Sequence, residues 1–273
     1  MSHKKDGVDM GRIVVDIGGS GTRIGVVSEK GVAAIQRESL DSVEGLIAAI
    51  KERADKVTGV AISVPGFVQG DSGKVLLSRN APWLVGNLSG QLKNAFPEIP
   101  IHVVNDGEAH ALALLSHSDL KLGAINLSIG TGVGFGVLDI NGKVVRNASG
   151  ENWDIGDMWI KTSASEPYAW WALGEHGIEE LKNSAKEGAY KKFGYRLGAF
   201  LSQLAIIFRP RTIGLSGGYI SRYWDAMKDA VREEFKAPTN IEPRIVAQKD
   251  AEVALVGLAE LLDLSRAKEG FLL

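Results

Sequence analysis

The sequence contains the same short pattern twice, about a hundred residues apart. In each copy an apolar run enters a glycine-rich turn and a second apolar run leaves it: DIGGSGTRIGVV begins at Asp16, and SIGTGVGFGVL begins at Ser128. Glycine adopts positive φ with little strain, so each copy predicts a tight β-hairpin. One such hairpin is common in mixed sheets, but two matched copies indicate internal duplication. We therefore expect an α/β protein of two related lobes, with the glycine turns facing a cleft between them.

Hydrophobic periodicity predicts the elements around these turns. In the first half we expect strands at 12–16, 23–28, 32–37, 58–64 and 101–104, and a helix from Asp41 with Glu44 completing a capping box. In the second half we expect strands at 124–128, 135–139, 143–146 and 212–215, helices across 167–208, and closing helices near 221–235 and 251–262. The predicted organisation is a tail at 1–11, an N-terminal lobe at 12–119 and a C-terminal lobe at 120–273. The last helix either stays with the second lobe or packs back on the first.

Composition excludes several classes of protein. The 31 basic and 33 acidic residues nearly balance, which gives no sign of a nucleic-acid or membrane surface partner. There are no cysteines, so disulfides, a catalytic thiol and a thiolate zinc site are excluded. Residues 1–11 are polar, and no apolar run is long enough to span a membrane. We expect a cytoplasmic protein without zinc.

The glycine turns are candidate phosphate sites. Successive backbone N–H groups in such a turn form a concave nest that binds phosphate oxygens. No Gly-Lys-Ser/Thr follows either turn, and neither turn opens a helix, so neither is a Walker A loop or a dinucleotide fingerprint. Asp16 precedes the first turn and either holds Mg²⁺ through water or caps the turn. The candidate residues are Gly18, Gly19, Ser20, Gly21 and Thr22 in the first turn, and Gly130, Thr131 and Gly132 in the second.

Two further motifs follow predicted strands. Asn105-Asp106 stands between a strand and a helix, where a carboxylate can take the proton of an attacking hydroxyl. The alternative for this pair is a simple turn and helix cap. Gly217-Gly218 lets the backbone pass close to a flat group such as adenine, although a plain turn explains it equally well.

The order of these motifs resembles the ROK family of sugar kinases and sugar-responsive regulators, within the actin-like ATPase (ribonuclease H-like) fold. The resemblance covers nearly the whole chain and rests on DIGGSGTRIG, AISVPGFVQGDSGKVLLSRNAPW, VVNDGEAHALAL, INLSIGTGVGFGV, IGLSGGYIS and AEVALVGLAELL. It implies that Asp106 is the catalytic base and that Asn80 and Asn105 face the sugar. It also implies ATP and Mg²⁺ as donor and metal, and a homodimer as the common assembly.

The sequence departs from the family pattern in two places. Where the family carries Gly-Glu-x-Gly-His, the best register places Asp154 at the glutamate and Asp157 at the histidine. A competing register begins at Gly150-Glu151. The family's cysteine-rich zinc motif is absent, which makes the chain similar to the short polyphosphate- and ATP-dependent glucokinases. An ionised aspartate only accepts hydrogen bonds, so the changed pocket favours a donor-rich acceptor such as an amino sugar.

These patterns together predict a sugar kinase that uses ATP to phosphorylate a hexose or hexosamine. Its partners would be a small sugar and a nucleotide. One alternative is a polyphosphate-dependent glucokinase. Another is a catalytically degenerate sugar sensor, although only about a dozen polar residues precede the first strand, too few for the helix-turn-helix that ROK regulators carry.

Overall fold

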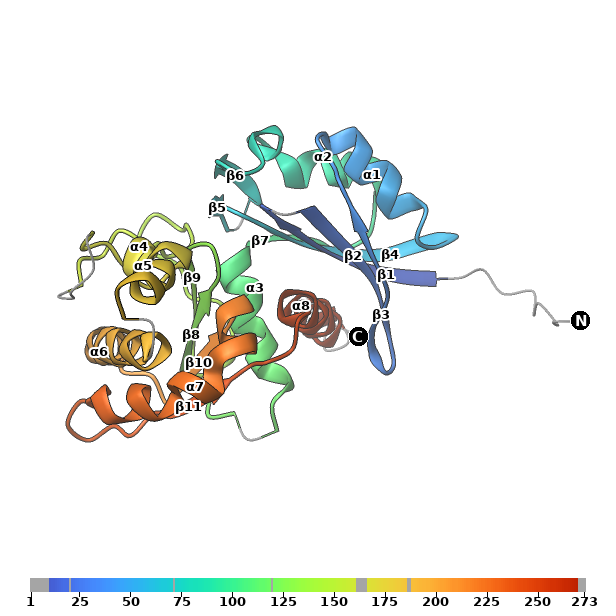
Figure 1. Ribbon diagram of the computed structural model, residues 1–273. Coiled ribbons are helices and arrows are strands. Elements are labelled where there is room, and N and C mark those ends of the chain that lie inside the picture. Colours follow the sequence, from blue (N-terminus) through green and yellow to red (C-terminus); the bar gives the residue numbers. More distant parts are fainter. Residues whose placement is uncertain are drawn as a thin grey trace, which may run out of the picture. The chain divides into compact units, whose positions relative to one another are not determined.

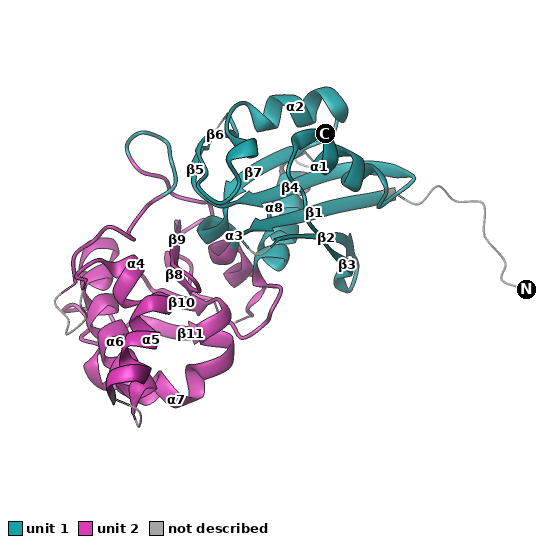
Figure 2. Cartoon of the chain, turned by 45° about the horizontal axis from the view of Figure 1, so that its top comes forward, with its two compact units in different colours: residues 1–109, 148–152, 254–273 teal, residues 110–147, 153–253 magenta. Residues whose placement is uncertain are grey.

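The first glycine turn joins β1 (Met10–Gly18) to β2 (Gly21–Ser28), and β3 (Gly31–Glu38) extends the antiparallel meander. We describe a computed structural model of the chain, covering residues 10–19, 21–70, 72–118, 120–160, 166–185 and 188–269. The chain divides into two units (Figure 2): residues 1–109, 148–152 and 254–273, and residues 110–147 and 153–253. The division therefore falls after Ala109, whereas the sequence suggested lobes that meet at 119/120.

The sheet of the first unit has five strands. Beside β1 lie the parallel strands β4 (Lys56–Val64) and β7 (Ile101–Asn105), giving the order β3-β2-β1-β4-β7 (Figure 1). Successive side chains point to opposite faces of this sheet, and each face packs in a separate core. Ile13 and Val15 pack with α1 (Val43–Lys51) and α2 (Leu88–Ala95), while Val14 packs with α3 (Asp106–Leu112) and α8 (Val253–Glu269). The last helix thus covers the second face of this sheet.

The sheet of the second unit repeats this order with one strand fewer. β9 (Val133–Leu138) pairs antiparallel with β8 (Ala124–Ile129), and β10 (Thr212–Ser216) and β11 (Arg244–Ala247) follow in parallel. Helices α4 (Ala169–Ala172), α5 (Glu175–Ala185), α6 (Ala189–Phe208) and α7 (Gly218–Glu234) pack around it. The shared strand order confirms the duplication that the two glycine hairpins predicted.

Several local expectations were wrong. The predicted strand at 143–146 is reduced to one bridge between Leu138 and Val144, flanked by backbone bonds between 139 and 143 and between 137 and 145. The Val145 carbonyl accepts instead from the Trp153 indole at 3.0 Å. The capping box at Asp41 is also wrong, since Ser42 caps α1 with its Oγ accepting from the Gly45 N–H. The helical stretch predicted at 167–208 is confirmed as α4, α5 and α6, whereas α7 begins three residues before the predicted 221.

A short hairpin that the sequence analysis missed lies in the first unit. It consists of β5 (Phe67–Gln69) and β6 (Lys74–Leu77). Residues 148–152 return to pair with it: the Asn152 side chain accepts from the Val68 N–H at 2.8 Å, and the Gly150 carbonyl accepts from the Gly70 N–H at 2.9 Å. This pairing places Glu151, the glutamate of the competing register, in the first unit beside Gln69.

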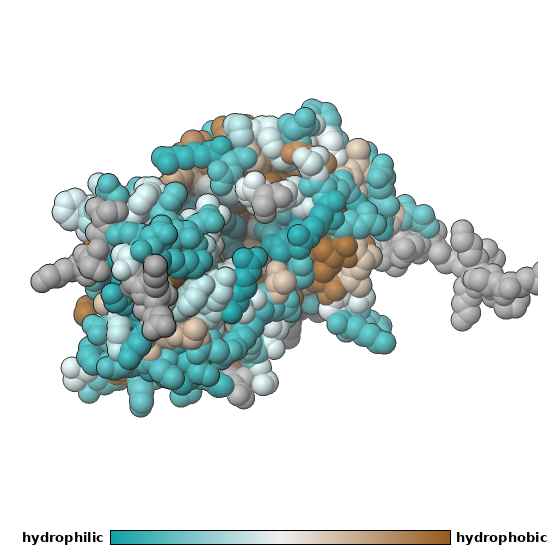
Figure 3. Space-filling model, in the orientation of Figure 1, coloured by the Kyte–Doolittle hydropathy of each residue, from teal (hydrophilic) through white to brown (hydrophobic). Residues whose placement is uncertain are grey.

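Within the described ranges, no helix combines the length and apolar character needed to cross a membrane. The face shown in Figure 3 is mainly hydrophilic, with apolar side chains gathered in small areas. Large apolar side chains that are exposed include Ile140, Trp159, Ile206 and Ile207.

Candidate functional site

Three sequence motifs of the first unit meet at the carboxyl ends of its parallel strands. Asp16 at the end of β1 lies opposite Ser63 on β4, and Asn105 ends β7 opposite Val64. The carboxyl edge of such a sheet is where α/β proteins commonly bind ligands. The positions of Asp16 and Asn105, far apart in the sequence, therefore define a candidate site in this unit.

Asp16 is almost fully buried, with 6% of its surface exposed. Ser63 Oγ donates to one carboxylate oxygen at 2.6 Å, and Arg23 Nε donates to the other at 3.1 Å within an ion pair. Arg23 is held there because it faces Asp16 across the β1–β2 ladder. Arg23 Nη2 also donates to that second oxygen, Oδ2, so the lone pair that these partners leave free lies on Oδ1. The arrangement fits a magnesium ion reached through water better than direct coordination.

Asn105 directly precedes α3, the helix that carries the predicted base Asp106, and forms a capping box with Glu108. Its Oδ1 accepts from the Gly107 N–H at 2.8 Å, and Glu108 Oε2 accepts from the Asn105 N–H at 3.1 Å. Its Nδ2 donates to the Gly66 carbonyl at 2.8 Å. The predicted sugar ligand is thus buried and engaged in fixing the start of α3 to the Pro65-Gly66 turn. Glu108 was missed, although the Asn-x-x-Glu spacing was readable.

Asp106 is the first residue of α3, and its Oδ1 accepts from the Gly107 N–H at 2.9 Å. Burial, together with the nearby Asp16 carboxylate, raises the pKa of Asp106 from 3.8 to about 6. A carboxylate with a pKa close to neutral is suited to accept a proton. The capping box fixes the backbone that carries it, so the group is held in one place.

Asn80, a predicted sugar contact, lies against the first glycine turn. A Cβ built on Gly19 would stand 3.4 Å from Asn80 Nδ2, so the two touch. Gly21 in the same turn has φ +128°, a conformation that favours glycine. Gly18 ends β1, and Thr22 is buried. Ser20 lies outside the described residues.

The two nucleotide motifs of the second unit are neighbours. Gly217 takes φ +92°, and a Cβ there would lie 2.5 Å from the Ile129 carbonyl oxygen, immediately before the second glycine turn. Within that turn the Gly130 N–H donates to the Gly132 carbonyl, and the Thr131 carbonyl accepts from the Glu175 N–H. The strand β10 therefore delivers Gly217-Gly218 beside Gly130–Gly132, the two motifs for which the sequence predicts a nucleotide.

A buried polar network that the sequence analysis missed holds these strand ends. Ser216 Oγ accepts from Asn126 Nδ2 at 2.9 Å and bonds His110 Nδ1 at 2.8 Å. Gln248 Nε2 donates to Asn126 Oδ1 at 2.9 Å and to the His110 carbonyl at 3.1 Å. In the β8–β10 register Asn126 pairs with Gly214, two residues before Ser216, so only the strand pairing reveals the contact.

The two substituted positions, Asp154 and Asp157, are both exposed and belong to the second unit. Asp154 Oδ1 accepts from the Gly156 N–H at 2.8 Å and so caps its own turn. Asn80, Asn105 and Asp106 belong to the first unit. The convergence of these residues, and of the two glycine turns, on one sugar is a prediction from the sequence.

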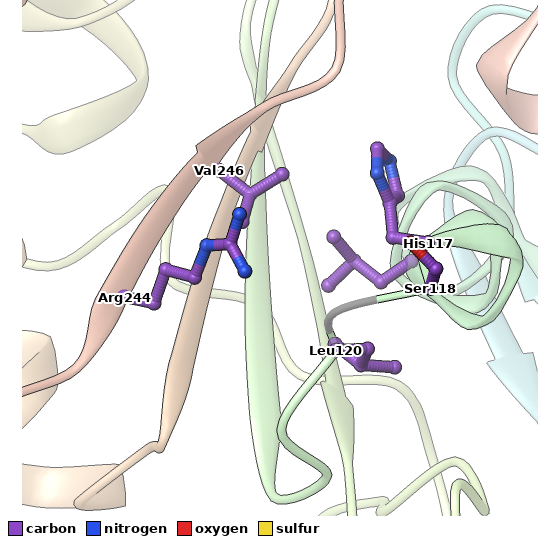
Figure 4. A pocket seen from close by; sticks show the side chains of 6 residues that line it. His117, Ser118, Leu120, Arg244 and Val246 are labelled. Atoms are coloured by element: carbon purple, nitrogen blue, oxygen red, sulfur yellow. The ribbon is translucent and has the colours of Figure 1, made fainter.

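A small pocket lies at the other end of the second sheet (Figure 4). It includes Arg244, the first residue of β11, whereas Gly217 follows the last residue of β10, and these strands are parallel. Its volume of about 60 Å³ is far below the roughly 300–1,000 Å³ of a drug-sized ligand site. It is therefore unsuited to a sugar or nucleotide. The lining residues are Leu114, His117, Ser118, Leu120, Arg244 and Val246.

Comparison with known proteins agrees with this geometry. A sequence model described as "ROK family" matches residues 7–169, more than half of the chain. The chain belongs to the ROK family. It is 22% identical over 272 residues to a glucokinase of Halalkalibacterium halodurans, an alignment that covers 84% of this chain and 81% of that protein.

Solved ROK structures share the whole architecture. A ROK family glucokinase from Streptomyces griseus, solved with glucose and AMPPNP, is 20% identical with a TM-score of 0.75, covering 92% of this chain and 98% of that one. A ROK family transcriptional regulator, a homologue of the E. coli MLC protein, is 18% identical with a TM-score of 0.74. The match covers 93% of this chain and 78% of that one. The fold is the two-lobed actin-like ATPase fold. ROK proteins of this fold include both sugar kinases and regulators.

Proposed function

We propose that this ROK protein is a sugar kinase that transfers the γ-phosphoryl group of ATP to a hydroxyl of a hexose or hexosamine. The observation that carries the proposal is the position of Asp106, which follows β7 directly at the carboxyl edge of the first sheet and is held there by the Asn105–Glu108 capping box. A protein that only senses a sugar has no need of a fixed base at this edge. The retained glycine turns support the same conclusion, since a sensor does not require two phosphate nests.

In the proposed mechanism, Asp106 accepts the proton of the acceptor hydroxyl as that oxygen attacks the terminal phosphorus. Asn105 and Glu108 hold the base in position through the capping box. Backbone N–H groups of the two glycine turns bind the phosphate chain. Asn80 and Asp154 are proposed sugar contacts, and Asp157 is a proposed acceptor for a hydroxyl or amino group of the sugar.

Magnesium is part of this proposal. Bound to the donor, the ion would neutralise charge on the phosphate oxygens. Asp16 is the proposed contact through water, and it would use the Oδ1 lone pair that Ser63 and Arg23 leave free. In the described residues, no group of three or more His, Asp or Glu side chains could hold a metal by itself. The ion is therefore expected to arrive with the nucleotide.

The test is a coupled ADP-release assay with Mg-ATP across hexoses, hexosamines and N-acetylhexosamines. Sugar-dependent turnover supports a kinase and identifies its acceptor. A higher kcat/KM for glucosamine than for glucose would support the acceptor-rich pocket, whereas phosphorylation of glucose with no reaction of glucosamine would refute it. Sugar binding by calorimetry without turnover, using either ATP or polyphosphate, would favour the regulator function instead.

The rate should depend on pH through the ionisation of Asp106. Because only the carboxylate form accepts a proton, kcat/KM should be constant above about pH 7 and should fall about tenfold per unit below the pKa of about 6. The measurement is the initial rate between pH 5 and 8 in buffers of matched ionic strength. Circular dichroism at each pH serves as the control for folding. A flat profile down to pH 5 would contradict Asp106 as the base.

Removal of the metal should abolish turnover. With several carboxylates near the donor, the phosphate chain binds poorly unless a cation screens it. We expect excess EDTA to reduce sugar-dependent ADP formation to background, and added Mg²⁺ to restore it. The control is EDTA premixed with a molar excess of Mg²⁺. Full activity in EDTA alone would disprove the metal requirement.

A further inference from the structure

The helix that carries the predicted base is bonded to the strand that leads into a predicted nucleotide motif. Asp106 is the first residue of α3, and His110 follows four residues later, so the two lie on the same side of the helix. The Nδ1 atom of His110 bonds Ser216 Oγ at 2.8 Å, and Ser216 ends β10 directly before Gly217. One helical turn and one hydrogen bond therefore connect the base to the motif.

The two central strands of the second sheet present a polar face to this helix. Asn126 of β8 pairs with Gly214 of β10, and Ser216 lies two residues further along, on the same face of the strand as Gly214. A Cβ built on Gly214 would stand 2.5 Å from Asn126 Oδ1 and 2.9 Å from the methyl carbons of Leu114, which follows α3 in the 3₁₀ turn η2 (Ala113–Ser116). The missing side chain of Gly214 thus leaves room for the Asn126 amide and for the helix.

The bond belongs to a buried network of four side chains. Ser216 and Asn126 are fully buried, and Gln248, which directly follows β11, is 5% exposed. Because Ser216 Oγ accepts from Asn126 Nδ2, its hydroxyl hydrogen is left for His110 Nδ1. Gln248 Nε2 completes the network by donating to Asn126 Oδ1 and to the His110 carbonyl. An unpaired polar atom at this depth costs free energy, so the four side chains are held together.

Helix α3 passes from the first unit into the second. The boundary falls after Ala109, so Asp106 belongs to the first unit, whereas His110 and the rest of the network belong to the second. Within an α-helix, residues four apart are joined by a backbone hydrogen bond. A restraint on the end of β10 therefore reaches Asp106 through Ser216 and His110.

We propose that His110 is a positioning residue that couples the nucleotide motif to the predicted base. A nucleotide bound at Gly217-Gly218 would restrain Ser216, and the hydrogen bond would pass this restraint to the helix that presents Asp106 to the sugar. Binding of the second ligand then loses less conformational entropy, so each ligand should raise the affinity for the other. The inference rests on the proposed function for the identity of the two ligands, and it adds a link between them that the proposed mechanism lacks.

The experiment measures how the ATP analogue AMPPNP changes sugar affinity, by isothermal titration calorimetry with Mg²⁺ and whichever of glucose and glucosamine binds more tightly. In the unchanged protein we expect AMPPNP to raise sugar affinity at least about fivefold, the lower end of typical coupling between sites. His110→Ala and Ser216→Ala should each reduce this ratio to below about twofold. His110→Asn should keep most of it, because the asparagine amide occupies the position of Nδ1 and can still bond the Ser216 hydroxyl.

His110→Ala and Ser216→Ala remove the bond from opposite sides, so either serves if the other folds poorly in urea denaturation. The matched control is His117→Ala, which removes an exposed histidine from the small pocket at the other end of the sheet. It should leave the ratio unchanged.

Three results would overturn the proposal. One is a ratio near one in the unchanged protein, and another is an equal loss of coupling in His110→Asn and His110→Ala. The third is the signature of a purely structural network: a lower free energy of unfolding in His110→Ala with an unchanged ratio. Because the readout is binding, coupling that depends on His110 in a protein without turnover would refute the kinase and retain the inference. Turnover with a ratio that His110→Ala leaves unchanged would do the reverse.

Discussion

Asp106→Asn is expected to lower kcat by about 10²- to 10⁴-fold, the usual contribution of a general base. Asparagine has the same shape and still accepts a hydrogen bond from the Gly107 N–H through its side-chain oxygen. It cannot take a proton at neutral pH. Sugar affinity, measured by calorimetry, should therefore remain within a factor of about three, while ADP release in the coupled assay falls to near background.

The control for this variant is Asp229→Asn, which removes an exposed carboxylate of α7 that pairs loosely with Arg232 at 3.8 Å. Its kcat should equal that of the unchanged protein. Two outcomes would count against Asp106 as the base. One is a kcat for Asp106→Asn within tenfold of normal, and the other is an equal loss in the control. A protein that shows no turnover before mutation but binds sugar would be a regulator.

Gly217→Ala should cause the largest loss of stability among the site variants. Gly217 has φ +92° and ψ 171°, a region open almost only to glycine. An added Cβ would lie 2.5 Å from the Ile129 carbonyl oxygen and 2.7 Å from its nitrogen, both backbone atoms that cannot move aside. We expect the free energy of unfolding to fall by about 2–4 kcal/mol, measured by urea denaturation, with AMPPNP affinity falling as well.

Gly218→Ala provides a matched control one residue away. Nothing lies within 4 Å of a Cβ built there, and Gly218 is the first residue of α7, where alanine is tolerated. The free energy of unfolding of this variant should equal or slightly exceed that of the unchanged protein. Equal stability of Gly217→Ala and Gly218→Ala would show that the close approach of β10 to Ile129 is not required.

The repeated parts of the fold were predictable because they are local. A glycine turn between two β-branched runs specifies its hairpin from about a dozen residues, and both hairpins were found. The strand-then-Asn-Asp order similarly placed Asp106 at a strand end. The segment 143–146 keeps only one bridge to β9, and its Val145 carbonyl accepts from the Trp153 indole, a tertiary contact that the local sequence does not reveal.

The partners of the site residues were not predictable in the same way. Arg23 and Ser63 become visible as partners of Asp16 only once β1 is known to lie between β2 and β4. The stacking of Tyr190 on Tyr223 likewise depends on how α6 meets α7, since the two residues are far apart in the sequence. Sequence patterns identify the residues that have a chemical role. The long-range pairing of strands and packing of helices decides which of those residues lie in the same site.

The return of α8 to the first sheet has a consequence for biosynthesis. Leu255, Leu258 and Leu262 cover the face that carries Val14, Ala61 and Val104, so this apolar face is fully covered only after α8 has been translated. Domains made early on the ribosome generally fold before later ones. Here a sheet built from residues 10–105 must wait for a helix that begins at Val253, and until then part of its apolar face is exposed to water. A ribosome-stalled chain that ends before 253 should therefore be far more sensitive to protease than the released protein.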